Sequence, residues 1–291
     1  MNIDKAKHLI NGLYDISLNC DCDDLVYHPI RIIESSKSII GINPDRPEVK
    51  LLDYCERYIS SFKHRKIKAD FSEVSMPAVV TFLDLELSIK EKNKELSRRN
   101  LYYLSRVSDG THILEFLLEF SLKYCSVSFL LIWSVYRMHL FLGLDNILKS
   151  LLVCLECILI DVDKKRKGMD LDVDDLLKKC KLHKDSFECF FSLYRIAKND
   201  FVRNSTIQPL VVSIMNEKFL FSNNKNNLIL NKDQKSKGRS WILDFFSKID
   251  EKKIDNDLIL NMDSARGVLK ALNGSNEELV WGRLNKFYGI K

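Results

Sequence analysis

The longest apolar stretch of the chain, His112 to Ile160, is interrupted by charged residues throughout its length. A transmembrane helix needs about 18 or more consecutive apolar residues. The charge-free run inside the stretch, Tyr124 to Tyr136, is shorter than that and includes three serines. The stretch therefore predicts helices buried in a protein core and excludes a membrane as a partner.

Composition agrees with a helical protein that has a sizeable core. The chain has 291 residues, of which 46% are hydrophobic, and this allows one large domain or two modest ones. Only 5 prolines and 10 glycines occur, which favours long helices over a β-sandwich or a glycine-rich nucleotide-binding fold. The N-terminal residues do not resemble a signal peptide, so we expect a cytoplasmic protein whose 8 cysteines are reduced thiols.

These patterns predict a mainly α protein with a bundle-like core of many helices, one short β-hairpin and a C-terminal helical part. Residues 1–160 are expected to form an N-terminal helical domain with buried core helices. Residues 161–185 read as a charged loop or linker. Residues 186–291 read as a C-terminal helical part with a hairpin near 219–230, where two short apolar runs flank a turn of asparagines.

Several boundaries follow from helix start and stop signals. We expect one helix from near Pro77 to Arg99, and Gly143 between two buried helices, one that ends near Leu142 and one over residues 146–160. Pro209 should interrupt any helix that reaches it, because proline lacks the amide proton of a helical hydrogen bond. Residues 232–239 are expected to be a basic, polar linker.

No metal or cofactor is expected. Cys154 and Cys157 have the spacing of one half of a zinc site, but they lie in an apolar helical pattern without a second pair. Cys20 and Cys22 are separated by one residue, which is poor geometry for tetrahedral zinc. The sequence also lacks the common phosphate-loop, dinucleotide, zinc-protease and serine-hydrolase motifs. These observations favour a protein that is not an enzyme.

One segment carries a weak catalytic pattern. Arg195 to Asn204 ends an amphipathic helix with an arginine-asparagine pair, Arg203-Asn204. The pair resembles part of the Arg-polar-x4-His motif of HEPN ribonucleases, a family of helical RNases. The resemblance implies RNA cleavage at a dimer interface, with the arginine stabilising charge. The chain departs from the motif at the decisive place, since Pro209 stands where the histidine would be expected.

The remaining functional signal is a set of basic clusters. The formal net charge is +5, which permits binding to nucleic acid without requiring it. Phosphate binding needs cations that converge on one face, and aromatic side chains next to them can stack on bases. The candidate nucleic-acid-binding residues are Lys63, Arg65, Lys66, Lys68, Lys164, Lys165, Arg166, Lys167, Lys235, Lys237, Arg239 and Trp241.

Three classes of function therefore follow from the sequence, in this order. The first is a helical protein that binds DNA or RNA through basic loops, as part of a larger assembly. The second is a non-catalytic subunit that contacts a protein partner, or a second copy of the chain, through its apolar helices. The third is a HEPN-like ribonuclease or another helical enzyme.

Overall fold

The computed structural model describes residues 3–65, 67, 71, 79–143, 147–163, 165–221, 232–274 and 276–290. Within these residues the chain is mainly α-helical and has one short antiparallel pair of strands, which confirms the predicted fold class. In chain order the elements are α1 (Ile3–Ser17), α2 (Pro29–Ile40), α3 (Val49–Ser60), α4 (Phe82–Lys90), α5 (Lys94–Val107), α6 (Gly110–Tyr124), α7 (Ser128–Leu142), α8 (Ile147–Asp161), α9 (Val173–Lys179), β1 (Cys180–Lys181), α10 (Lys184–Ala197), α11 (Asn204–Lys218), β2 (Leu220–Phe221), α12 (Lys232–Lys237), α13 (Ser240–Lys248), η1 (Glu251–Lys253), α14 (Asn256–Leu272) and α15 (Glu278–Tyr288).

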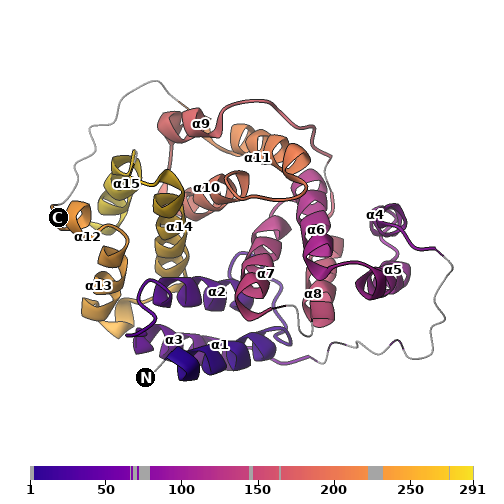
Figure 1. Cartoon of the computed structure of the whole chain (residues 1–291), viewed down its shortest axis with the longest axis horizontal. Coiled ribbons are helices and arrows are strands. Elements are labelled where there is room, and N and C mark those ends of the chain that lie inside the picture. The colour runs from indigo at the N-terminus through magenta and orange to yellow at the C-terminus, as the bar shows by residue number, and fades with distance from the viewer. Residues whose placement is uncertain are drawn as a thin grey trace.

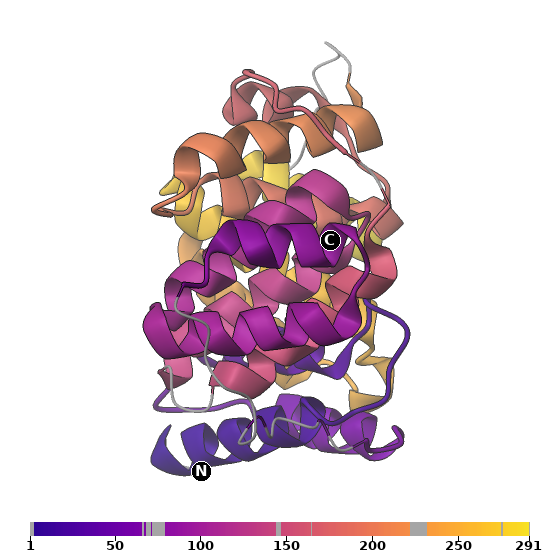
Figure 2. The same ribbon diagram turned by 90° about the vertical axis from the view of Figure 1, so that its right-hand side faces the viewer.

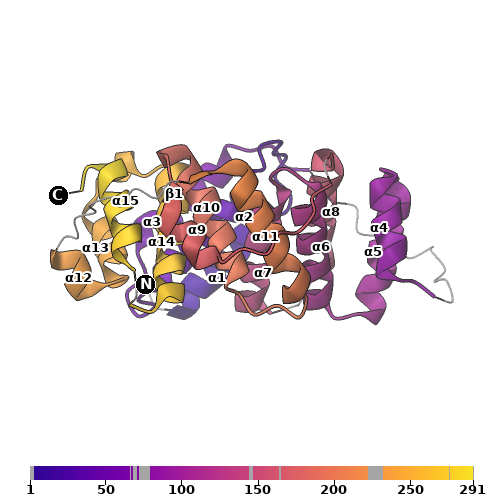
Figure 3. The same ribbon diagram turned by 90° about the horizontal axis from the view of Figure 1, so that it is seen from above.

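Helix α2 lies at the centre of the helix packing. It contacts α1, α3, α7 and α14, while α14 also packs along α10 and α10 along α11. Figure 1 shows these helices between α4 and α5 at one end of the molecule and α12 and α13 at the other, with α1 and α3 along the bottom. Figure 3 shows the same separation from above, and Figure 2 shows the N-terminal helices in indigo along the bottom.

The buried apolar residues form one connected cluster. It extends from Ile10 in α1 to Leu284 in α15. The packing of α2 against α14, and an ion pair of 2.6 Å between Arg31 of α2 and Glu188 of α10, join residues on either side of the predicted linker at 161–185. The division into an N-terminal domain (residues 1–160) and a C-terminal part (residues 186–291) stays a prediction. In the described part of the chain, no helix combines the length and apolar character that a bilayer crossing requires.

The long apolar stretch forms three helices, α6, α7 and α8. Gly143 ends α7 as predicted, with a positive φ of 90° that glycine adopts readily. An additional break at residues 125–127 separates α6 from α7. Here Asp161, the last residue of α8, accepts the backbone N–H groups of Val127 and Ser128 at 2.8 Å each. This distant carboxylate starts α7, which explains why local periodicity did not reveal the break.

The single helix predicted from near Pro77 to Arg99 is wrong, because two helices occupy this region. Pro77 lies outside the described residues, and α4 begins at Phe82. Lys92 then takes a left-handed conformation (φ 55°) and Asn93 caps α5 by accepting the N–H of Leu96 at 3.1 Å. Asparagine favours caps over helix interiors, and this preference outweighs the continuous helical pattern.

Pro209 does not interrupt a helix, contrary to prediction, because α11 runs through it from Asn204 to Lys218. The missing amide proton leaves the carbonyl of Ser205 without its helical partner. Ser205 is exposed and lies in the first turn, where water can solvate that carbonyl. The helix therefore loses one hydrogen bond near its start and continues.

The strand pairing and the C-terminal basic segment also differ in detail from expectation. The short strand β2 begins where the hairpin was predicted, and it pairs with β1 through Cys180↔Phe221 and Lys181↔Leu220. The predicted second strand, at 228–230, lies outside the described residues. Residues 232–237, expected as a linker, form helix α12, so this basic segment is not a loop.

Candidate functional site

The basic loop after α8 is held to the protein by a buried arginine. Arg166, expected on a solvated loop, is only 7% exposed. Its Nη1 donates to the carbonyls of Leu122 and Cys125, and its Nε donates to Glu217 at 2.9 Å. These carbonyls lie at the C-terminal end of α6, where helical acceptors lack partners within the helix. Arg166 therefore anchors the loop to α6 and α11.

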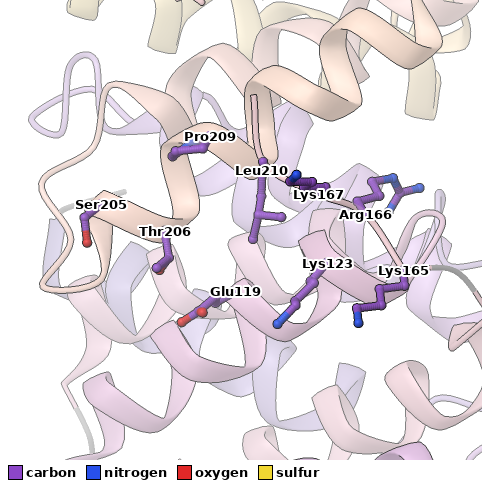
Figure 4. Close-up of a pocket in the computed structure, with 10 residues that line it drawn as sticks. Glu119, Lys123, Lys165, Arg166, Lys167, Ser205, Thr206, Pro209 and Leu210 are labelled. Atoms are coloured by element: carbon purple, nitrogen blue, oxygen red, sulfur yellow. The ribbon is translucent and has the colours of Figure 1, made fainter. Parts of the chain in front are cut away.

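The neighbouring side chains line a pocket of about 610 Å³, which we call the lysine pocket. Figure 4 shows Glu119, Lys123 and Lys165 along one side of it, facing Thr206, Pro209 and Leu210. Its lining residues are Glu119, Lys123, Lys165, Arg166, Lys167, Gly168, Ser205, Thr206, Pro209 and Leu210. The structure thus brings two predicted residues, Lys165 and Lys167, together with Lys123 from α6.

The charges around the lysine pocket are unevenly compensated. The carboxylate of Glu119 is occupied by Arg203, whose Nη1 lies 2.7 Å from it, and Arg166 is occupied by Glu217. Among the described residues, no carboxylate lies within 4.0 Å of the ammonium groups of Lys123, Lys165 or Lys167. The pocket therefore presents three lysine ammonium groups without a direct ion pair in the described chain, of which Lys123 also interacts at longer range with Glu86. It also presents two hydroxyl groups, those of Ser205 and Thr206.

The first predicted cluster, at the end of α3, is only partly described. Lys66 and Lys68 lie outside the described residues, as does Lys164 of the loop after α8. Lys63 is exposed, and Arg65 pairs with Glu156 of α8 at 3.0 Å. The positive charge of Arg65 is therefore partly neutralised by the carboxylate of Glu156.

The third predicted cluster lies on α12 and the start of α13. Lys235 and Arg239 are exposed, and Lys237 pairs with Asp244 at 2.7 Å. The ring of Trp241 stacks on Phe245 and meets Trp281 edge-on. Figures 1 and 3 place α12 at the opposite end of the molecule from α6 and α8, so this cluster does not converge with the lysine pocket.

The residues of the HEPN-like pattern lie in two different parts of the structure. Arg203 contacts Glu119 beside the lysine pocket, whereas Arg195 is buried between helices and lies 2.9 Å from Asp263 of α14. The side-chain oxygen of Asn204 is buried and has no hydrogen-bond partner within the described chain. The RNase function that the pattern implies stays a prediction.

Arg195 belongs to a buried charge network that sequence reasoning did not find. Arg137 of α7 lies 2.7 Å from Glu34 of α2 and 2.8 Å from Asp263, which also binds Arg195 and Arg266. Burial alone would raise the pKa of Asp263, but Arg137 and the other two arginines hold that pKa well below its ordinary value. The carboxylate is therefore ionised inside the protein. A charged residue within an apolar helix, such as Arg137, was the available signal.

The described residues contain no group of three or more His, Cys, Asp or Glu side chains placed to hold a metal ion. Cys154 and Cys157 are buried side chains of α8, and burial raises the pKa of both thiols, that of Cys157 to about 12. A comparison with protein-family models, curated proteins and solved structures gave no match.

Proposed function

We propose that the chain binds the phosphate backbone of a nucleic acid at the lysine pocket. The observation that carries this proposal is that Lys123, Lys165 and Lys167, from two separate segments, line one pocket without a carboxylate within 4.0 Å of their ammonium groups among the described residues. Lysines placed in this way displace the counterions of phosphate groups, and that release drives binding. The hydroxyls of Ser205 and Thr206 can donate hydrogen bonds to phosphate oxygens.

The rigidity of the loop supports the same proposal. Arg166 fixes Lys165 and Lys167 on either side of it, and the N–H of Met169 bonds to the carbonyl of Pro209 at 3.0 Å. A fixed arrangement lowers the entropy lost when a ligand binds. Lysines and hydroxyl groups contact phosphates without reading the bases, so the proposal concerns backbone contacts without a preference for sequence.

The test is a titration against fluorescent single- and double-stranded DNA and RNA at about 50 and 200 mM salt. Three phosphate contacts on duplex DNA predict a slope of about −2.7 in log affinity against log salt, or about a 40-fold loss over this range. The variant Lys123→Gln/Lys165→Gln/Lys167→Gln should lose this salt-dependent part of the affinity.

The matched control is Lys235→Gln/Lys237→Gln/Arg239→Gln, which removes the same charge from α12 and the start of α13, at the far end of the molecule. Its affinity and salt dependence should equal those of the unchanged protein. Loss of binding in this control, with binding retained in the pocket variant, would place the contact on α12 and overturn the proposal. No binding at the lower salt would also overturn it.

A further inference from the structure

A second pocket lies over the buried charge network, between α2, α7, α10 and α14. Its volume is about 380 Å³, and we call it the arginine pocket. Six of its lining side chains are cations, and the others are small, polar or apolar. The lining cations that matter here are Lys37, Arg137, Arg195, Arg266 and Lys270, whereas Lys198 pairs with Asp174 at 2.8 Å.

The network beneath the arginine pocket has more positive than negative charge. Among the described residues, Lys37 and the three arginines pair with two carboxylates, those of Glu34 and Asp263. Glu188 also acts on Arg137, but it is paired with Arg31, so two positive charges remain. Both carboxylates are almost fully buried, at 0% and 2% side-chain exposure. Burial strengthens electrostatic interactions, so this excess is felt in the pocket more strongly than it would be on an open surface.

Arg195 lies among other cations in this network. Its Nη1 is 2.9 Å from Asp263, a carboxylate that also pairs with Arg137 and Arg266. Burial, followed by repulsion from Arg137, lowers the pKa of the Arg195 guanidinium to about 10. One carboxylate thus serves three guanidinium groups.

Hydrogen-bond donors on the wall are also incompletely used. Within the described chain, Arg195 donates hydrogen bonds only through Nη1, to the backbone and side-chain oxygens of Asp263. Trp133 lines the same pocket, is 4% exposed, and its buried indole Nε1 has no acceptor in the described chain. A donor without an acceptor is unfavourable in the folded protein, so a ligand that accepts hydrogen bonds from the remaining donors of Arg195 would be stabilised here.

We propose that the arginine pocket binds the dianionic phosphate group of a small phosphomonoester. Two negative charges match the two uncompensated positive charges of the network. Guanidinium groups pair with phosphate through two parallel hydrogen bonds, and the exposed Lys270 adds a charge at the rim. A volume of about 380 Å³ is in the range of small-molecule sites and leaves room for more than the phosphate itself.

The experiment measures thermal unfolding of the full chain with glycerol 3-phosphate up to about 10 mM at constant ionic strength, since a ligand of the folded state raises the unfolding temperature. We expect a rise that grows with glycerol 3-phosphate, and none with glycerol or with the monoanion dimethyl phosphate. Calorimetry then gives the Kd. A rise with inorganic phosphate alone, or no rise with either phosphate, would overturn the proposal.

Variants distinguish the pocket from general stabilisation by anions. Lys270→Gln changes an exposed side chain and should fold normally, while its Kd for glycerol 3-phosphate rises about threefold or more. Arg195→Met should weaken binding about tenfold or more. Lys235→Gln, on α12, is the control of equal charge and should bind as the unchanged protein does. Equal affinity in Lys270→Gln and in the control would contradict the proposal.

The outcome is independent of the nucleic-acid proposal. The variant Lys123→Gln/Lys165→Gln/Lys167→Gln should keep its full affinity for glycerol 3-phosphate, because none of these lysines lines the arginine pocket. A 5′-phosphorylated oligonucleotide, compared with its 5′-hydroxyl form, tests whether the phosphate can belong to a nucleic-acid end. Tighter binding of the phosphorylated form than of glycerol 3-phosphate would overturn the small-molecule part of the proposal.

Discussion

Gly267 of α14 lies directly against the guanidinium of Arg195 in α10: a Cβ at position 267 would be 2.0 Å from Nε and 2.3 Å from Cζ. Only a residue without a side chain lets the buried arginine reach Asp263 between these two closely packed helices. The absence of a side chain at Gly267 therefore makes room for Arg195 in the charge network.

We expect Gly267→Ala to lower the free energy of unfolding by about 1–3 kcal/mol, since overpacking moves Arg195 away from its carboxylate. Gly12→Ala is the control, because Gly12 is an exposed helical glycine and an added Cβ there would have no atom within 4 Å. This substitution should stabilise the protein by up to about 1 kcal/mol. Urea denaturation measures both. In an Arg195→Met background the destabilisation caused by Gly267→Ala should be smaller. An equal destabilisation in both backgrounds would mean that Gly267 and Arg195 are not coupled, and it would contradict the prediction.

Arg166→Met should destabilise the protein by about 2–4 kcal/mol, because it removes the donor to the end of α6 and leaves two buried carbonyls without it. Residues 165–172 should also become more accessible to trypsin, which limited proteolysis detects. Lys165→Met, one residue earlier and exposed, should change stability by less than about 0.5 kcal/mol. Equal effects of the two substitutions would mean that Arg166 does not anchor the loop.

Acid should destabilise the fold through His28. This residue is 2% exposed and caps α2, where Nδ1 accepts the N–H of Ile30, and burial lowers its pKa to about 3. The unfolded chain takes up a proton below about pH 6.5, which the folded protein does not do until about pH 3, so stability falls as the pH drops between these values. At pH 5 the loss is about 2 kcal/mol.

The matched variant for this effect is His28→Asn, which keeps a capping acceptor and cannot be protonated in this range. Urea denaturation at pH 7 and pH 5 should show a smaller loss of stability in the variant than in the unchanged protein. The same loss in both proteins would assign the acid sensitivity to other groups.

Lys92→Gly should stabilise the turn between α4 and α5. Lys92 holds a left-handed conformation that costs an L-residue about 1–2 kcal/mol and costs glycine nothing. After the larger entropy of glycine in the unfolded chain is subtracted, a gain of up to about 1 kcal/mol remains. Lys7→Gly, at an exposed position inside α1, should instead lose about 1 kcal/mol, and thermal unfolding compares them. A loss in both variants would contradict the assignment of strain at Lys92.

The predictable part of this fold is the part that local patterns determine. The boundary at Gly143 and the helix that ends near Ile160 were evident because glycine and apolar spacing act over a few residues. The start of α7 was not evident, because its cap comes from Asp161, more than thirty residues away. Pro209 misled the prediction because its cost is small near the start of a helix.

The candidate sites likewise contain residues that the sequence reveals and residues that only the fold brings together. Lys165 and Lys167 were found because a run of lysines is visible in the sequence, but Lys123 was missed, since only the fold places α6 beside that loop. The arginine pocket was missed for a stronger reason. Its carboxylates, Glu34 and Asp263, lie near opposite ends of the chain, and no local pattern pairs them with Arg137.

The packing of α2 against α14 has a consequence for how the protein is made. Synthesis proceeds from the N-terminus, so α2 leaves the ribosome long before α14 does. Until then Arg137 of α7 and Arg195 of α10 lack Asp263, and the face of α2 that packs on α14 has no partner there. The nascent chain must keep this face of α2 in water while more than two hundred residues are added, and the charge network can be completed only near the end of translation.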